Sequence, residues 1–408
     1  MDEIGKSQHM YAGTNGIKDQ NKIIYDNVKM VETSPVDQSR SKVCLLAIDG
    51  GGMRGIIAAT VLVHLEEALK RKSGNPKARI KDYFDIAAGT SVGGLLVSFL
   101  FAGDENGHPI FTAEESFKFM IEKGKDIFKF RRAQRVFASL RGLFSPKYST
   151  QFWESVLQTL FIRNGEAITM RDTLKPLIIP GYDLATAGPV VFKTADAIDS
   201  PSWNFRLWEV IRATSSVPGL WKPARLTSVD GTNSFAAVDG GLVLNNPTGV
   251  AVNHILNNKR EFLSVNSIHD MLILSIGCGQ FDRTYEYRKV HRWGSLQWFK
   301  PIAKIIIDSW ADMVDFAICT MYGKDQDNYL RIQVTGLPDQ AVSEVDDPSS
   351  RNVEKLKKMG REALEQKTLG YTKLSLKQLH DKSNKERLEL FAEALVSERR
   401  RRELNTKK

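Results

Sequence analysis

The sequence is poor in cysteine. Only three of its 408 residues are cysteines, and Cys44, Cys278 and Cys319 show no C-x-x-C spacing. This pattern argues against a framework of disulfides and against a zinc site built from cysteine pairs. Each cysteine lies in an apolar segment, so we interpret all three as buried thiols in a reducing compartment.

Long apolar runs are also missing. No window approaches the ~18 apolar residues that a membrane-spanning helix requires. Residues 1–42 are polar and lack the apolar core of a signal peptide. We therefore expect a cytoplasmic protein whose contact with membranes is peripheral.

The chain has no excess of acidic residues. It carries 57 Lys and Arg against 48 Asp and Glu, which gives a net charge of +9. A basic chain favours anionic lipid surfaces, nucleic acid or phosphate-bearing substrates, although the charge can also serve solubility alone. The H-E-x-x-H pattern of zinc hydrolases is absent as well, and we expect neither a metal nor a cofactor.

Short apolar runs alternate with helical patterns along most of the chain. Runs that predict buried strands lie at residues 43–48, 83–88, 177–184, 190–194, 235–238, 271–276 and 328–334. Helical spacing or apolar content predicts helices at residues 56–69, 95–102, 111–143, 150–160, 207–214 and 248–255. This alternation predicts an α/β fold: a three-layer α/β/α sandwich with a mostly parallel central sheet.

The segment Gly89-Thr90-Ser91-Val92-Gly93 joins a predicted strand to a predicted helix. It has the G-x-S-x-G pattern of a nucleophile elbow, in which a sharp turn exposes the serine hydroxyl. Gly89 and Gly93 leave room where the strand and the helix crowd each other. We therefore predict Ser91 as a nucleophile, although the same five residues can also form a turn without chemistry.

A glycine loop follows the first predicted strand, at Gly50, Gly51 and Gly52, with Arg54 shortly after. With Gly55 it satisfies G-x-G-x-x-G, the fingerprint of dinucleotide sites. The acidic residue that such a site needs about 20 residues further on falls inside a helical pattern instead. The competing interpretation is an oxyanion hole, with backbone N–H groups turned into a cavity and Arg54 adding positive charge.

A third motif, Asp239-Gly240-Gly241, follows the predicted strand at residues 235–238. Asp-Gly is a common turn, so Asp239 alone predicts only a turn. Together with Ser91, however, a carboxylate in an apolar cleft can act as a general base, because desolvation raises its pKa towards neutrality.

The glycine loop, the serine elbow and the Asp-Gly-Gly turn together resemble the patatin-like phospholipases, the plant lipid acyl hydrolases. Further similar segments lie at residues 213–215, 244–247, 274–277 and 328–333. The resemblance implies a Ser91–Asp239 dyad without histidine and an oxyanion hole at Gly50, Gly51, Gly52 and Arg54. It also implies that the acyl esters of membrane glycerolipids, either phospholipids or galactolipids, are cleaved through an acyl-enzyme.

The domain boundaries follow from the same patterns. We expect residues 1–42 to be disordered or loosely attached, and residues 43–340 to form the patatin-like catalytic domain. Residues 341–408 are charged and helical in pattern, and we expect them to pack on that domain or trail from it. Ser383 and Glu386 predict a capping box at the start of a final helix, with Leu388, Phe391 and Leu395 as its apolar stripe.

Two other functions compete with the dyad. An ordinary Ser-His-Asp esterase or lipase would recruit His254, His269 or His291. A non-catalytic lipid-binding or nucleic-acid-binding protein would use the basic stretches at residues 125–141 and 288–300, where cations alternate with aromatic residues. The intact Ser91 and Asp239 favour an enzyme that acts on lipid, and we expect an anionic membrane surface as a partner rather than nucleic acid.

Overall fold

The central sheet is built from the apolar runs. Its strands are β1 (Val43–Ile48), β2 (Ile86–Gly89), β5 (Leu177–Asp183), β6 (Gly188–Lys193), β7 (Ala224–Thr227), β8 (Ser234–Asp239), β9 (Met271–Ile276) and β10 (Tyr329–Ile332). They lie in the order β10-β9-β1-β2-β5-β8-β7, with β6 beside β5. The pairs from β10 to β5 are parallel, whereas β6, β8 and β7 are antiparallel to their neighbours.

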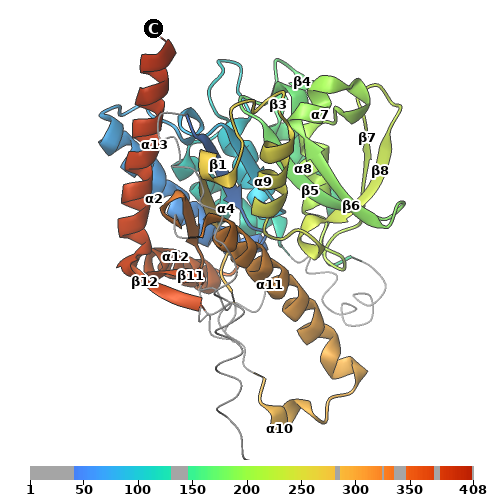
Figure 1. Cartoon of the computed structure of the whole chain (residues 1–408). Helices are drawn as coiled ribbons and strands as arrows, with labels where there is room; N and C mark the ends of the chain where they lie inside the picture. Colours follow the sequence, from blue (N-terminus) through green and yellow to red (C-terminus); the bar gives the residue numbers. More distant parts are fainter. Residues whose placement is uncertain are drawn as a thin grey trace, which may run out of the picture. The chain divides into compact units, whose positions relative to one another are not determined.

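The structure is a computed structural model, drawn in Figure 1, and it describes residues 41–129, 146–280, 285–323, 326–334, 346–371 and 377–406. Its helices before the final segment are α2 (Gly55–Ser73), α3 (Val92–Phe101), α4 (Ala113–Ile127), α6 (Thr150–Leu160), α7 (Thr194–Asp199), α8 (Leu207–Thr214), α9 (Thr248–Asn257), α10 (Tyr287–Val290) and α11 (Ser295–Tyr322). A short pair, β3 (Ile162–Arg163) and β4 (Glu166–Ala167), stands apart from the main sheet.

Strand β1 is buried on both faces and feeds two cores. Cys44, Leu46 and Ile48 pack into a cluster with residues of α2, α3 and α4. Val43 and Leu45 point the other way, into a second cluster with residues of α9 and α11. The sheet therefore has helices on both faces, and the predicted three-layer α/β/α fold with a mostly parallel sheet is confirmed.

The antiparallel end of the sheet delivers Asp239. Strand β8 runs against β5, with Asp239 opposite Gly181, so β8 ends near the edge where the parallel strands also end. Its partner β7 was not predicted, because its four residues mix apolar and charged side chains and give no clear period. In the segment predicted as helix over residues 111–143, α4 ends at Ile127, and residues 130–145 lie outside the described part.

The C-terminal segment contains α12 (Ser350–Glu365), the antiparallel pair β11 (Lys367–Tyr371) and β12 (Lys377–Ser383), and α13 (Asn384–Thr406). Both helices pack against α2. The predicted capping box is present: the Ser383 N–H donates to Glu386 at 2.7 Å, and the Glu386 N–H donates to the Ser383 hydroxyl at 3.2 Å. Sequence patterns indicated only helix here, so the hairpin is an addition.

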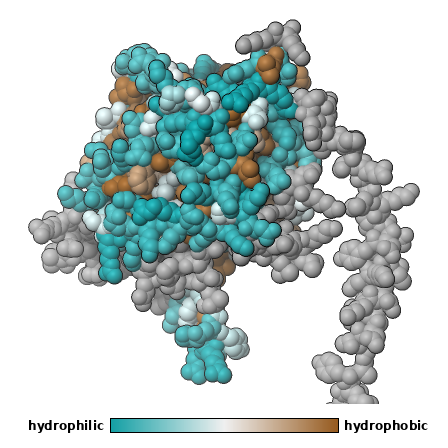
Figure 2. All heavy atoms as spheres, turned by 90° about the vertical axis from the view of Figure 1, so that its left-hand side faces the viewer, coloured by the Kyte–Doolittle hydropathy of each residue, from teal (hydrophilic) through white to brown (hydrophobic). Residues whose placement is uncertain are grey.

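The surface on the side of α13 is largely polar. Figure 2 shows this face, where hydrophobic residues occur in small groups among hydrophilic ones. Within the described ranges, no helix is both long and apolar enough to cross a bilayer.

Candidate active site

Ser91 stands at the sharp turn between β2 and α3. Its backbone has φ 53°, an unusual value for a residue with a side chain. The backbone is closely packed before and after Ser91, where β2 turns into α3. A Cβ on Gly93 would lie 2.2 Å from the carbonyl oxygen of Ile48, and one on Gly89 would lie 2.3 Å from the carbonyl oxygen of Gly93. Only glycine fits at these two positions, as the elbow pattern requires.

A threonine from α8 holds the elbow in this conformation. The backbone N–H of Ser91 donates to the hydroxyl oxygen of Thr214 at 2.9 Å, and that hydroxyl donates to the carbonyl of Pro180 at 2.6 Å. The N–H of the strained residue is therefore satisfied by a fixed side chain. Motif reasoning did not assign Thr214 a role. Its position at the end of a predicted helix, before the loop with Pro218, was the available signal.

Asp239 lies directly beside Ser91. The Ser91 hydroxyl donates to one carboxylate oxygen of Asp239 at 2.8 Å, and the N–H of Gly241 donates to the other at 2.6 Å. Its own backbone N–H donates to the carbonyl of Ser216 at 3.1 Å. Gly240 allows a close approach to β5, because a Cβ there would lie 2.4 Å from the carbonyl oxygen of Pro180. The structure thus brings together two residues that are 148 positions apart.

Burial governs the protonation of Asp239. Its side chain is buried, and loss of solvent raises the pKa of the carboxyl to about 7, against the hydrogen bonds from Gly241 and Ser91 that favour the charged form. A carboxyl with a pKa near the operating pH can both accept and return a proton. The pair therefore has the geometry and the proton affinity of a nucleophile with its base.

The pair opens into a largely apolar cavity of about 200 Å³. Its walls come from α3, α4, α6, α11 and the loop after α8. The large apolar side chains of the lining are Val92, Leu95, Phe119, Met120, Ile127, Phe128, Trp153, Val217, Leu220, Trp221, Leu242 and Ile307. Such a lining suits a hydrocarbon chain better than a charged or sugar-rich ligand.

The glycine loop forms another part of the cavity wall, but its three N–H groups are not equivalent. The N–H of Gly50 donates to the carbonyl of Asn245 at 3.1 Å, so it is not available to a ligand in this arrangement. The oxyanion hole predicted for Gly50, Gly51, Gly52 and Arg54 stays a prediction, and in this arrangement its remaining donors would be Gly51 and Gly52. Gly51 and Gly52 line the same cavity as Ser91 and Asp239. Gly52 has φ 56°, a conformation that favours glycine.

Arg54 also lines the cavity, but it is tied to backbone carbonyls. Its guanidinium donates to the carbonyl of Gly279 at 2.8 Å and, more weakly, to that of Gly51 at 3.4 Å. Burial lowers the pKa of Arg54, and nearby acidic groups that include Asp308 oppose that shift. Arg54 therefore braces the glycine loop while it contributes positive charge to the wall.

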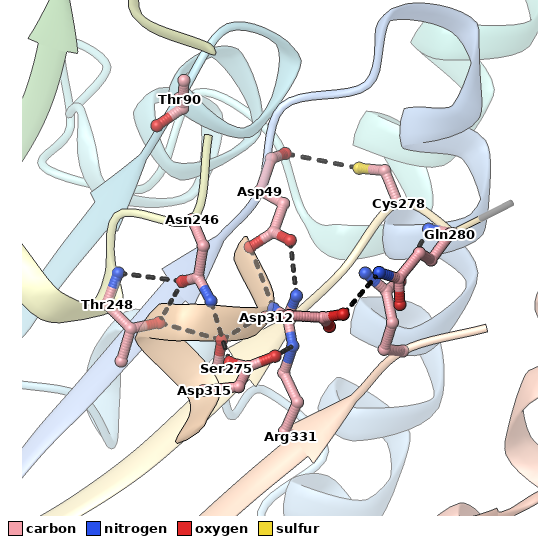
Figure 3. Close-up of polar contacts among 12 residues, drawn as sticks. Asp49, Thr90, Asn246, Thr248, Ser275, Cys278, Gln280, Asp312, Asp315 and Arg331 are labelled. Carbon is pink, nitrogen blue, oxygen red and sulfur yellow. Dashed lines mark hydrogen bonds and ion pairs between the residues drawn. The ribbon is translucent and has the colours of Figure 1, made fainter. Parts of the chain in front are cut away.

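Beneath the glycine loop lies a buried ion cluster that motif reasoning did not find (Figure 3). Arg331 on β10 donates to both carboxylate oxygens of Asp49, at 2.9 and 2.6 Å, and its Nε lies 2.9 Å from a carboxylate oxygen of Asp315 on α11. Burial lowers the pKa of Arg331, but Asp315 and Asp49 more than reverse this and raise it well above its usual value. The guanidinium is therefore charged between its two carboxylates.

Neutral side chains extend this cluster to the loop that holds Gly50. Asn246 and Tyr329 donate to Asp315 at 2.8 and 2.7 Å, and Ser275 accepts from Arg331 at 2.8 Å. Thr248 donates to Asn246 at 2.7 Å. The cluster joins β1, β9, β10, α9 and α11 at one edge of the sheet (Figure 3). Because Asp49 directly precedes the glycine loop, the cluster fixes where that loop begins.

The histidines of the rival triad lie elsewhere. His254 is paired with Glu261, the ring of His269 packs against Tyr322, and the ring of His291 stacks on Tyr287. No histidine is among the described residues that line the cavity. Nor does the described part of the chain contain a group of three or more His, Cys, Asp or Glu side chains placed to hold a metal ion.

The basic stretches are only partly described. Of residues 125–141, those from 130 onward lie outside the described part. Phe128, before that point, is half-buried, packs against Tyr148 and Trp221, and lines the cavity. In the second stretch, Arg288, Lys289 and Arg292 are exposed around α10, whereas Trp293 and Trp298 are half-buried against each other.

Comparisons with known proteins identify the relatives of this chain. Residues 46–252 match the family model described as "Patatin-like phospholipase". The chain is 40% identical over 376 residues to "Patatin-like protein 6" of Arabidopsis thaliana, which covers 90% of this chain and 74% of that protein. It is equally 40% identical, over 378 residues, to "Probable inactive patatin-like protein 9" of the same plant, covering 92% and 91%.

Among solved structures, that of VipD from Legionella pneumophila matches with a TM-score of 0.34 and 11% identity. The match covers 79% of this chain and 66% of that one. This likeness is too weak to say anything about the site.

Proposed function

This chain belongs to the patatin-like phospholipase family, and we propose that it is a lipid acyl hydrolase with Ser91 as nucleophile and Asp239 as general base. The family resemblance predicted from the sequence is confirmed. The observation that carries the proposal is the direct hydrogen bond of 2.8 Å from the Ser91 hydroxyl to the buried Asp239 carboxylate at an apolar cavity.

The first half of the reaction forms an acyl-enzyme. The Ser91 oxygen attacks the ester carbonyl carbon while its proton passes to Asp239. The carbonyl oxygen becomes an oxyanion, which the N–H groups of Gly51 and Gly52 stabilise, a contribution of about 3–4 kcal/mol per donor. The tetrahedral intermediate collapses when the alcohol leaves with the proton from Asp239.

The second half regenerates the enzyme. A water molecule gives a proton to Asp239 and attacks the acyl carbonyl, which forms a second oxyanion. When that intermediate collapses, the bond to Ser91 breaks, the serine oxygen regains the proton, and a fatty acid is released. A carboxyl with a pKa of about 7 can accept and return the proton in both halves without a histidine.

The proposed substrates are the acyl esters of membrane glycerolipids, either phospholipids or galactolipids. The apolar lining of the cavity supports this choice, because an acyl chain loses contact with water when it enters. The three free and buried cysteines support a reducing compartment such as the cytoplasm. Exposed Arg288, Lys289 and Arg292 support docking on an anionic membrane surface.

Mass spectrometry of the products tests the proposal. Purified protein is incubated separately with phospholipid and galactolipid vesicles, and free fatty acids and lysolipids are measured over time. We expect product from the wild type and none above background from Ser91→Ala. Ser155→Ala, at an exposed serine of α6, is the matched control and should retain full activity. Equal product from Ser91→Ala would refute the role of the serine.

A further inference from the structure

Helix α11 carries apolar side chains on two sides: Ile318, Cys319 and Tyr322 are buried in the core, and a second apolar group faces solvent. Most surface helices turn their apolar side chains inward and their charged side chains to solvent. On α11 the exposed large apolar side chains, 39–58% accessible, are Ile302, Ile305, Ile306, Trp310, Met313 and Met321. Among the described residues, this helix carries more exposed side chains of this kind than any other element.

The spacing shows that these residues form one stripe. Ile302, Ile306, Trp310 and Met313 follow at intervals of four, four and three residues, which places them on the same side of a helix. Exposed Ala317 continues the stripe towards Met321. The pattern is a continuous face and not a set of scattered exposed residues.

The acidic residues of the same helix point into the protein. Asp315 is paired with Arg331, and Asp312 accepts a hydrogen bond from Gln280 at 3.0 Å. The negative charge of Asp308 opposes the lowering of the pKa of Arg54 by burial. Figure 3 shows Asp315 directed at Arg331 of the cluster beneath the glycine loop, and Asp312 directed at Gln280. The orientation of α11 is therefore fixed by ion pairs and hydrogen bonds, and these hold its apolar stripe outward.

Two observations indicate that the stripe meets lipid. The same helix also reaches the candidate active site, because Ile307, next to Ile306 in the sequence, lines the cavity beside Ser91. In addition, the chain leading into α11 carries the exposed cations Arg288, Lys289 and Arg292 at the end of the helix that lies away from the sheet (Figure 1). An apolar stripe with cations and indole rings at one end is typical of helices that lie in the interface of an anionic bilayer.

We propose that the outer face of α11 is the membrane-docking surface of this protein, and that it lies in the headgroup region of an anionic bilayer with Ile302, Ile306, Trp310 and Met313 in the lipid. The choice of lipid as the occupant rests on the proposed function. In this orientation, Ile307, the residue of α11 that lines the cavity, lies close to the bilayer. A glycerolipid can then pass from the bilayer along α11 to Ser91.

Vesicle binding tests this surface directly. Trp310→Glu is compared with the wild type in cosedimentation with phosphatidylcholine vesicles that contain phosphatidylserine, and with phosphatidylcholine alone. Leu263→Glu, at a side chain that is 81% exposed outside α11, is the matched control because it introduces the same charge. Trp310 is 57% exposed, so its replacement should leave the thermal midpoint unchanged. We expect Trp310→Glu to weaken binding to the mixed vesicles by about tenfold or more, and Leu263→Glu to leave it near wild type.

A second measurement separates docking from catalysis. Hydrolysis of a soluble short-chain ester should be equal in Trp310→Glu and wild type, while hydrolysis of vesicle lipid falls. The binding assay is repeated with Trp310→Glu in the Ser91→Ala variant, because vesicle binding can be measured without any catalytic activity. If lipid hydrolysis is absent but binding still depends on Trp310, the proposed function fails and the docking surface stands.

Two results would overturn the inference. One is Trp310→Glu binding vesicles as tightly as Leu263→Glu does. The other comes from light scattering without lipid: a dimer that Trp310→Glu dissociates would identify the stripe as an interface between two copies of the chain.

Discussion

Asp239 and Asp49 are both buried carboxylates at the carboxyl ends of strands, but their partners differ. Asp239 has only a hydroxyl and a peptide N–H as hydrogen-bond donors, and its pKa lies at about 7. Asp49 has the two nitrogens of a guanidinium, which Asp315 shares. Burial raises the pKa of both carboxyls, but Arg331 opposes that shift at Asp49 and holds the side chain in place, whereas no cation among the described residues does so at Asp239. The proposed base, Asp239, thus lines the same cavity as the glycine loop, and the structural carboxylate, Asp49, directly precedes that loop.

The largest expected effect separates chemistry from folding at the reactive site. Ser91→Ala should lower lipid hydrolysis by about 10⁴-fold or more, because the acyl-enzyme cannot form. The side chain is 7% exposed and its loss leaves little space, so the melting temperature should stay within a few degrees of wild type. Calorimetry beside the product assay checks both. Loss of activity together with unfolding would not support a purely chemical role.

Asp239→Asn removes the base but keeps the shape. We expect activity to fall by about 10³-fold, since no carboxylate can take the serine proton. Stability should move in the opposite direction. The raised pKa of Asp239 means that the native state binds a proton more tightly than the unfolded chain, so wild type loses stability as pH rises from about 4 to about 7.

Asp239→Asn has no carboxyl at this position, so it does not lose stability between about pH 4 and about pH 7 in this way. Chemical denaturation at about pH 8 should therefore show Asp239→Asn more stable than wild type by about 1–3 kcal/mol, with the difference shrinking towards pH 4. A variant less stable than wild type at every pH would contradict the assignment of a strained, unneutralised carboxylate.

Arg331→Met should damage the structural site instead. It leaves Asp49 and Asp315 buried without their cation, which costs about 3–5 kcal/mol of stability. Hydrolysis should fall as well, because Asp49 directly precedes the glycine loop. Arg225→Met, at an exposed arginine of β7, is the matched control and should change neither. Denaturant titration and the product assay measure the two effects. Unchanged stability of Arg331→Met would show that Arg331 does not stabilise the buried Asp49 and Asp315.

A pH profile tests the reactive site without mutation. The base must be ionised, so kcat/KM should fall by about tenfold for each pH unit below about 7 and level off above it. A profile with its midpoint near 4 would mean that Asp239 is not desolvated in the working enzyme. The soluble ester is the appropriate substrate, because vesicle binding has a pH dependence of its own.

The smallest expected effect is that of a calcium chelator, which should leave hydrolysis unchanged. The proposed mechanism needs only Ser91, Asp239 and backbone donors. Activity lost in chelator and restored by calcium would show that this description of the reactive site is incomplete.

The sequence predicted the parts of the site that depend on local pattern. The elbow at Ser91, the turn at Asp239 and the strands before them are contiguous segments with a clear hydrophobic signal. Arg331 and Asp49, in contrast, are 282 residues apart, and no sequence motif contains both of them. The hydrogen bond from Gly50 to Asn245 could not be predicted for a similar reason, since Asn245 belongs to a distant loop.

The orientation of α11 could not be predicted either, because it depends on contacts with residues that are distant in the sequence. Its carboxylates face inward because Arg331 and Gln280 are there to meet them, and both come from other strands and loops. A helical pattern read alone would have assigned the acidic side to solvent. The hairpin of β11 and β12 was missed because its segment is charged and has no regular period.

The backbone at Ser91 has a consequence for the evolution of the family. A residue with a side chain at φ 53° costs about 1–3 kcal/mol, and glycine at the same position would not. A single change from serine to glycine would therefore remove the proposed nucleophile and relieve the backbone strain in one step, while it also removes the hydrogen bond to Asp239. We therefore expect that descendants that no longer need the reaction can lose Ser91 at little cost to folding, because relief of the strain offsets the lost contact.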